Sequence, residues 1–80
     1  MIYYVYILQS LNYPEHYYVG YTTNLKNRLT DHNSGGTTST SKYKPLKIKN
    51  AISFLEKEKA LEFEKYLKSH SGRAFSKKHF

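Results

Sequence analysis

The sequence contains no cysteine, which removes two common ways of stabilising a small domain. Neither a disulfide nor a thiolate-bound metal can hold this chain together. Its 80 residues are enough for one domain, residues 1–80, and domains of this size bury only roughly 60% of the surface that the unfolded chain exposes. Nine Tyr and four Phe make up 16% of the sequence, and their large rings are the expected source of core area.

Long apolar runs are also missing. No stretch of 18 apolar residues occurs, so the sequence predicts no membrane-spanning helix. The N-terminal segment MIYYVYILQS lacks the cationic flank and the small-residue cleavage site of a signal peptide. The expected location is therefore the cytoplasm, which also suits a chain without disulfides.

Acidic residues are few. The chain has 6 Asp and Glu against 13 Lys and Arg, which gives a net charge of +7. Such an excess in a small domain points to a polyanionic partner, either nucleic acid or an anionic membrane surface. Because nothing spans a bilayer, we expect nucleic acid. The sequence indicates no protein partner and leaves the oligomeric state open.

Three segments have the composition of strands. Residues 2–9 are rich in Tyr, Val and Ile and are apolar enough for burial on both faces. A turn at residues 11–16 leads to a second strand at residues 17–22, close enough for an antiparallel hairpin. Residues 46–55 alternate well enough for a third strand, with an irregularity near Asn50 and Ala51.

Two helices and a loop complete the pattern. Thr23 or Asn24 is expected to cap a helix that runs to about His32, and a second helix is expected from about residue 56 to 69. Residues 33–45 have two glycines and five consecutive hydroxyl residues, which predicts an exposed loop with little fixed structure. Gly72 is expected to end the second helix, followed by one or two further helical turns. The order strand, strand, helix, strand, helix predicts an α+β domain with a three-stranded antiparallel sheet flanked by helices, without repeats.

The first helix has an unusual inward stripe. Leu25, Arg28, Leu29 and His32 follow the i, i+3, i+4, i+7 spacing of one helical face. A face that packs on a core should be apolar, and half of this one is ionisable. Two polar groups directed toward the sheet indicate a site.

The second helix repeats the anomaly with a single carboxylate. Ala60, Leu61, Glu64 and Leu67 share a stripe that is expected to face inward. A lone carboxylate there costs several kcal/mol unless a cation or a hydrogen-bond network meets it, or it becomes protonated. Groups of opposite charge on two helices are therefore expected to converge.

The polar residues of both helices and two tyrosine-rich segments together resemble the motifs of a known family. The segments YVY at 4–6 and YVG at 18–20 resemble the paired motif that names the GIY-YIG nuclease superfamily. Arg28, His32 and the AxxxExxxK pattern around Glu64 match its later motifs in order and spacing. The resemblance covers nearly the whole chain and is closest to the small stand-alone bacterial members. It departs at Tyr4, where the first motif has glycine, and no Asn occurs after Asn50, whereas some relatives have one that supports the active site.

The resemblance implies hydrolysis of DNA phosphodiester bonds with one divalent cation, usually Mg²⁺ and otherwise Mn²⁺, held by Glu64. It further implies that Arg28 neutralises the phosphoryl oxygens. Tyr18 is the implied general base, with Tyr6 positioning the water or relaying its proton. His32 then accepts a proton from Tyr18 or contacts the phosphate.

Each of these residues also has a structural interpretation. The tyrosines suit any strand, Arg28 and Glu64 can form a plain ion pair, and His32 can favour the end of a helix. The excess of basic residues can be a solvated surface or can bind phosphates with little base selection. The candidate DNA-binding residues are Lys26, Lys42, Lys68, Arg73 and Lys77.

Three functions therefore compete. The first is a metal-dependent DNA endonuclease with low sequence specificity, for which structure-selective repair, recombination or processing of foreign DNA are all open roles. The second is a non-catalytic nucleic-acid-binding module with the same fold. The third is a small interaction domain that binds an acidic protein through its basic face.

Overall fold

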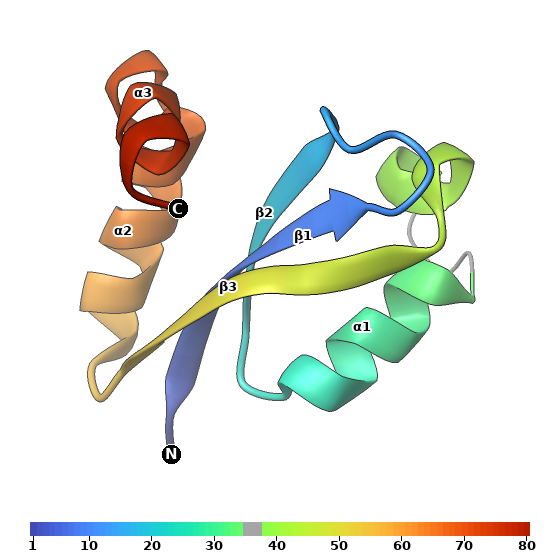
Figure 1. Cartoon of the computed structure of the whole chain (residues 1–80). Helices are drawn as coiled ribbons and strands as arrows, with labels where there is room; N and C mark the ends of the chain where they lie inside the picture. Colours follow the sequence, from blue (N-terminus) through green and yellow to red (C-terminus); the bar gives the residue numbers. More distant parts are fainter. Residues whose placement is uncertain (35–37) are drawn as a thin grey trace.

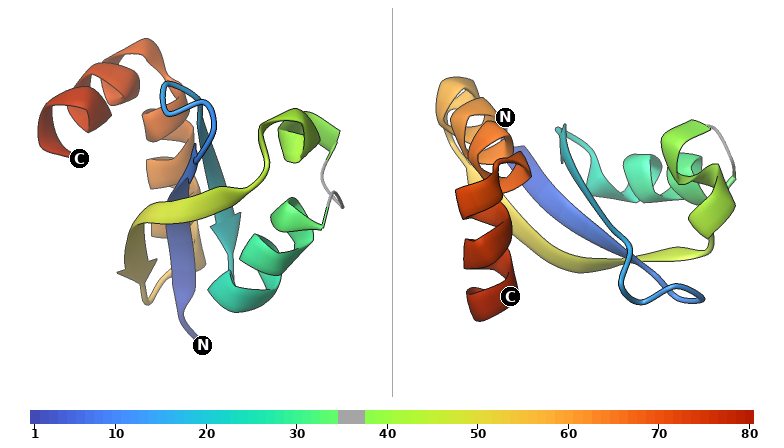
Figure 2. Two further views of the ribbon diagram at one scale, coloured as in Figure 1. Left: turned by 45° about the vertical axis from the view of Figure 1, so that its right-hand side comes forward. Right: turned by 90° about the horizontal axis from the view of Figure 1, so that it is seen from above.

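A computed structural model describes residues 1–34 and 38–80 of the chain. One three-stranded antiparallel sheet lies between helices on both of its faces, as Figures 1 and 2 show. This confirms the predicted α+β class and the predicted sheet. The elements are β1 (Tyr3–Ser10), β2 (Tyr17–Thr22), α1 (Leu25–Asn33), the 3-10 helix η1 (Thr38–Tyr43), β3 (Leu46–Phe54), α2 (Lys57–Lys68) and α3 (His70–His79).

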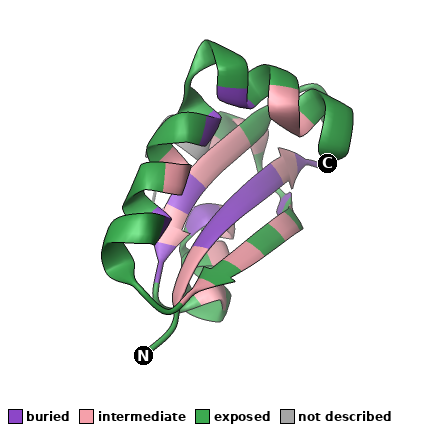
Figure 3. Cartoon of the chain, turned by 90° about the vertical axis from the view of Figure 1, so that its left-hand side faces the viewer, coloured by how far each residue is buried: buried purple, intermediate pink, exposed green. Residues whose placement is uncertain are grey.

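Strand β1 is the centre of the sheet, whose strand order is β2-β1-β3. Its residues Val5 to Leu8 are all buried, as the purple ribbon in Figure 3 shows. Because successive side chains of a strand point to opposite faces, this run contributes to two separate cores. The predicted burial of the first strand on both faces is confirmed.

The two cores lie on opposite faces of the sheet. On one face Val5 and Ile7 pack with Ala60 and Leu67 of α2, and aromatic side chains that include Phe75 surround them. The other core, on the α1 side, is built from the following residues: Tyr6, Leu8 and Leu46, with the partly buried Tyr18, Leu25, Leu29, Tyr43 and Ile48. The helices therefore hold different sets of β1 side chains.

Strand β3 pairs with β1 through a bulge. Ile7 lies opposite Asn50, and Leu8 lies opposite Ile48, so Lys49 is the additional residue. A bulge leaves one residue outside the ladder and bends the strand. The expected irregularity is present, although the extra residue is Lys49, directly before the predicted Asn50.

Asparagine side chains fix both ends of α1. The Asn24 side chain accepts a hydrogen bond from the Asn27 amide at 3.1 Å, so Asn24 is the predicted cap. At the other end, Asn33 accepts from the Leu46 amide at 2.6 Å and donates to the Leu46 carbonyl at 3.0 Å. This pair of bonds attaches the end of α1 to the start of β3.

The connection between α1 and β3 is more ordered than expected. Within the segment predicted as a loop, η1 spans Thr38–Tyr43, and residues 35–37 lie outside the described part of the chain. The backbone carbonyl of Tyr43 accepts a hydrogen bond from Ser10 Oγ at 2.7 Å. The Tyr43 ring stacks on His16, with ring centroids 3.9 Å apart. These contacts attach the connection to the β1–β2 hairpin, and they explain why the prediction of little fixed structure is wrong for residues 38–43.

The prediction that Gly72 ends the second helix is wrong. Helix α2 ends at Lys68, and Ser69 caps α3 by accepting a hydrogen bond from the Gly72 amide at 3.1 Å. Gly72 lies within the first turn of α3, where the backbone of α2 leaves no room for a side chain. A Cβ at this position would lie 1.8 Å from the carbonyl oxygen of Tyr66. Within the described residues, no helix has both the length and the apolarity to cross a membrane.

The close approach at Gly72 yields a stability prediction. Gly72→Ala should lower the free energy of unfolding by at least ~1–3 kcal/mol, because the new methyl group meets rigid backbone. Urea denaturation followed by circular dichroism measures this change, and Ser71→Ala at the exposed neighbouring position is the control. Equal stability of the two variants would contradict the packing described for α2 and α3.

Candidate active site

The candidate site lies at β2, an edge strand that both helical layers can reach. Tyr18 of β2 lies opposite Leu8, and Gly20 lies opposite Tyr6 of the central strand. Helix α1 covers one face of the sheet, and α2 packs on β1 and β2 from the other face, as Figure 2 shows. Side chains from four elements can therefore meet beside β2.

Gly20 makes room for the Tyr6 side chain. A Cβ at position 20 would lie 2.3 Å from Tyr6 Oη and 2.4 Å from Cζ, which no side chain can occupy. The Tyr6 ring therefore lies directly over the backbone of β2. The glycine of the second motif is required by this packing and not by an unusual backbone angle, since its φ lies outside the left-handed region.

Tyr6, Tyr18 and His32 form one contact cluster. Tyr6 Oη lies 3.2 Å from His32 Nε2 in a buried hydrogen bond, and the side chains are 2% and 1% exposed. The ring centroid of Tyr18 lies 4.8 Å from that of His32 and 6.4 Å from that of Tyr6. Side chains of β1, β2 and α1 thus meet in one cluster.

The surroundings keep Tyr6 and His32 uncharged near neutral pH. Burial, and then the neighbouring Tyr18, raise the pKa of the Tyr6 hydroxyl well above its usual range. Burial also lowers the pKa of His32, and the charge of Arg28 lowers it further. The hydrogen bond therefore joins a phenol to a neutral imidazole.

Arg28 is exposed, which corrects the expectation that its whole stripe faces inward. His32 is buried and Leu25 and Leu29 are half-buried, whereas Arg28 lies at the margin of the stripe. The Arg28 charge nevertheless opposes the rise in the pKa of Tyr6 and lowers the pKa of His32. Its guanidinium is therefore in electrostatic reach of the cluster and open to solvent, because the long stem carries the charge outward.

Glu64 approaches the cluster from α2. Its side chain is 20% exposed, and its negative charge contributes to the raised pKa of Tyr6. Its ionic partner is Lys68, with Nζ 3.1 Å from Oε2, and this is the one salt bridge within residues 1–34 and 38–80. The pairing of Glu64 with Arg28, considered above, is therefore not formed. Leu61 is 40% exposed, so the expectation that it faces inward with Ala60 and Leu67 is wrong.

The candidate DNA-binding residues do not form one surface. Lys26 of α1 and Lys42 of η1 are exposed on one side of the sheet. Lys68, Arg73 and Lys77 lie on the other side and line a cavity between β2 and α3. Sequence reasoning missed Tyr17 and Lys49, which line the same cavity. Strand alternation could have indicated Tyr17, because successive side chains of a strand point to opposite faces and Tyr17 must therefore point away from Tyr18.

Comparison with known proteins identifies the family to which this arrangement belongs. The family model of the GIY-YIG catalytic domain matches residues 2–78. The chain belongs to the GIY-YIG family. The YVY and YVG segments, Arg28 and Glu64 all fall inside the matched range.

Small relatives support the same membership. The chain is 41% and 39% identical over 66 residues to UPF0213 proteins of two Streptococcus pneumoniae strains. Each match covers 81% of this chain but 65% of the relative, so the chain spans less than two thirds of their length. The solution NMR structure of a UPF0213 protein from Bacillus halodurans is 33% identical, with a TM-score of 0.58, covering 96% of this chain and 81% of that one. This GIY-YIG protein therefore shares its fold with the UPF0213 protein of Bacillus halodurans.

The donor set of this GIY-YIG protein suits a cation held by few protein atoms. No group of three or more His, Asp or Glu side chains that could hold a metal occurs within the described residues. Glu64 offers one partly buried carboxylate, and its Lys68 partner is 52% exposed. Mg²⁺ usually keeps several waters and binds through one or two carboxylates plus phosphate oxygens, so the residues fit such an ion.

The space at Gly20 yields the first site prediction. Gly20→Ala should displace the Tyr6 ring, break its bond to His32 and lower the free energy of unfolding by ~1–3 kcal/mol. The double variant Gly20→Ala with Tyr6→Leu removes the obstructing ring and tests the cause. If the alanine costs as much in the Tyr6→Leu background as in the parent, the contact with Tyr6 is not the reason for the glycine.

The neutral state of His32 yields a pH prediction. Its pKa in the folded chain is below that of the unfolded chain, so its contribution to stability is complete above about pH 6.5 and is lost as the pH falls through the folded value. Urea titrations at several pH values should show a decline that His32→Gln lacks. Parallel pH profiles for parent and variant would exclude this role.

Proposed function

We propose that this chain is a metal-dependent DNA endonuclease with low sequence specificity, with residues 1–80 acting as one nuclease domain. One observation carries the proposal. The Tyr6–His32–Tyr18 cluster lies beside an edge strand, and the charges of Arg28 and Glu64 both act on Tyr6. Membership in the GIY-YIG family supports a nuclease fold and a nucleic-acid substrate.

Arg28 binds the scissile phosphate in this proposal. Its guanidinium is exposed, yet it acts electrostatically on the buried pair of Tyr6 and His32. A planar group with several N–H donors matches the oxygens of a phosphate and neutralises charge as it develops during attack. Arg28 can therefore hold the phosphate at the mouth of the cluster.

Tyr18 acts as the phenolate in this proposal: it gives up its own proton, to His32 or to solvent, and then accepts the proton of the attacking water. Tyr18 is half-buried, and its hydroxyl makes no hydrogen bond within the described residues, so it is available to a water. The neutral imidazole of His32 lies against the Tyr18 ring and can stabilise or receive the proton.

Tyr6 acts as a positioning residue. Its hydroxyl is buried and bound to His32, and its raised pKa keeps it protonated. It therefore has little access to the attacking water, and we assign it the orientation of His32 in place of the relay that the family resemblance allowed.

Glu64 holds the divalent cation, Mg²⁺ or Mn²⁺. When bound, the cation polarises the phosphate and stabilises the leaving oxygen. Lys68 pairs with the Glu64 carboxylate, with Nζ 3.1 Å from Oε2. A DNA phosphate that reaches Lys68 competes for this contact and frees the carboxylate for the ion.

Removal of the Glu64 charge tests the proposal. Glu64→Gln should lower the rate of cleavage of plasmid and branched DNA in Mg²⁺ or Mn²⁺ roughly 100-fold or more, and Arg28→Ala should do the same. Glu62→Gln, which changes an exposed carboxylate of the same helix, is the matched control and should cleave normally. EDTA should abolish cleavage by the parent.

Binding separates the competing functions. Glu64→Gln should retain DNA affinity in EDTA, because the positive surface is intact. DNA binding without cleavage by the parent in any metal would favour the non-catalytic module, which the Glu64–Lys68 ion pair also permits. Absence of DNA binding at low salt would favour an acidic protein partner.

A further inference from the structure

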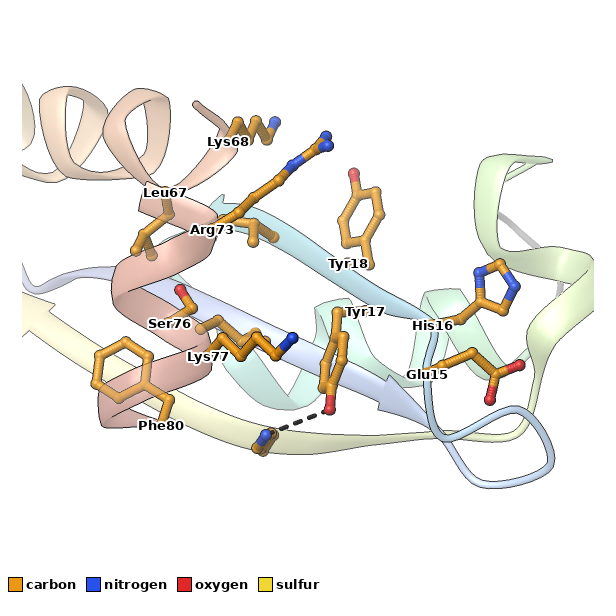
Figure 4. Close-up of a pocket in the computed structure, with 13 residues that line it drawn as sticks. Glu15, His16, Tyr17, Tyr18, Leu67, Lys68, Arg73, Ser76, Lys77 and Phe80 are labelled. Atoms are coloured by element: carbon orange, nitrogen blue, oxygen red, sulfur yellow. Dashed lines mark hydrogen bonds between the residues drawn. The ribbon is translucent and has the colours of Figure 1, made fainter. Parts of the chain in front are cut away.

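A cavity of about 830 Å³ lies between β2 and α3, on the side of the sheet away from α1. We call it the basic groove. Four cationic side chains line it, with Glu15 as the one acidic side chain in its lining: Lys49, Lys68, Arg73 and Lys77. Figure 4 shows the basic side chains of α3 pointing across the groove toward β2. The groove is therefore strongly positive.

The floor of the groove is apolar. The buried Ile7 and Leu67 line it, together with the partly buried Val19 and Phe80. Such a floor beneath a positive rim does not suit a small inorganic anion, which would leave the apolar surface uncovered. It suits a ligand that combines a flat apolar body with negative charge.

Tyr17 supplies a flat aromatic surface in the groove. Its side chain is 52% exposed, although it belongs to a regular strand. Lys49 Nζ lies 4.7 Å from the centroid of its ring and 3.5 Å from its hydroxyl. Lys77 extends toward the same ring from α3 (Figure 4). An exposed ring between cations is the arrangement that stacks a nucleobase and binds its phosphate.

The groove is continuous with the candidate active site. Tyr17 and Tyr18 are neighbours on β2 and point in opposite directions, yet both line the groove. Lys68, the partner of Glu64, lies at the same end as Tyr18. A nucleic-acid strand with a phosphate beside Tyr18 can therefore pass round the edge of β2 and place its next nucleotide over Tyr17.

We propose that the basic groove binds the unpaired nucleotides next to the scissile phosphate, with a base stacked on Tyr17 and phosphates on Arg73 and Lys77. This proposal rests on the nuclease function proposed above. Bases paired in a duplex stack on one another and are not free to cover Tyr17, so the groove selects single-stranded or branched nucleic acid. An acidic peptide would use the cations but not the aromatic surface.

Binding measured without metal tests the groove separately from catalysis. Fluorescence anisotropy in EDTA compares a short single-stranded oligonucleotide, its duplex and an abasic strand of equal length. Tyr17→Leu should weaken single-strand binding about tenfold and leave duplex and abasic binding unchanged, because only stacking is lost. Tyr17→Phe keeps the ring and is the matched control, which should bind like the parent.

The cations are tested by the salt dependence of binding. Lys77→Ala should reduce the slope of log affinity against log salt for the single strand by about one contact, whereas Lys57→Ala, far from the groove on α2, should not. Polyglutamate that competes as well as the oligonucleotide at equal charge would overturn the proposal. Equal losses for all three probes in Tyr17→Leu would also overturn it.

The two proposals fail in different ways. Single-strand binding that depends on Tyr17, without cleavage in any metal, rejects the nuclease and supports the groove. Cleavage that depends on Glu64, with unchanged single-strand binding in Tyr17→Leu, rejects the groove and supports the nuclease.

Discussion

The hydrogen bond between Tyr6 and His32 is the interaction on which the site depends. Both groups are buried, and a buried polar group without a partner would cost a few kcal/mol. Each satisfies the other, and the absence of a side chain at Gly20 is what allows the Tyr6 ring to lie where His32 can reach it. The bond also attaches α1 to the central strand, so the element that carries Arg28 is fixed relative to β2.

The edge position of β2 then determines what surrounds this bond. A central strand would be covered on both sides, whereas β2 leaves its outer side open to solvent and accessible from both faces of the sheet. Helix α1 supplies Arg28 and His32 from one face, and α2 supplies Glu64 from the other. Because alternate residues of a strand face opposite ways, Tyr17 and Tyr18 give the same edge two different aromatic surfaces.

Periodicity was enough to predict much of the fold and the polar stripe. The three strands, the Asn24 cap and the inward position of His32 follow from local spacing and composition, which act within a few residues. The end of α2 at Lys68 agrees with the predicted end near residue 69, but the role of Gly72 was wrong because the glycine was interpreted through its flexibility, whereas the structure requires it for close packing against Tyr66. Tertiary contacts decided that position.

The sequence predicted which residues belong to the candidate site, but not how they are arranged in space. Spacing selected Arg28 and Glu64, but it could not show that Arg28 is exposed or that Glu64 pairs with Lys68, since these depend on how two helices sit against a sheet. The groove was missed for the same reason. Its lining comes from all three strands and two helices, and no local pattern joins Tyr17, Lys49 and Lys77.

The electrostatic balance at Tyr6 restricts the path of the proton in the proposed reaction. Arg28 lowers the pKa of Tyr6 and Glu64 raises it, while burial outweighs both. Burial therefore keeps Tyr6 protonated, and an imidazole held by a protonated phenol keeps its orientation. We therefore propose Tyr18 as the exit for the proton of the attacking water, because it is the less buried of the two tyrosines and lies against both His32 and the open edge of the sheet.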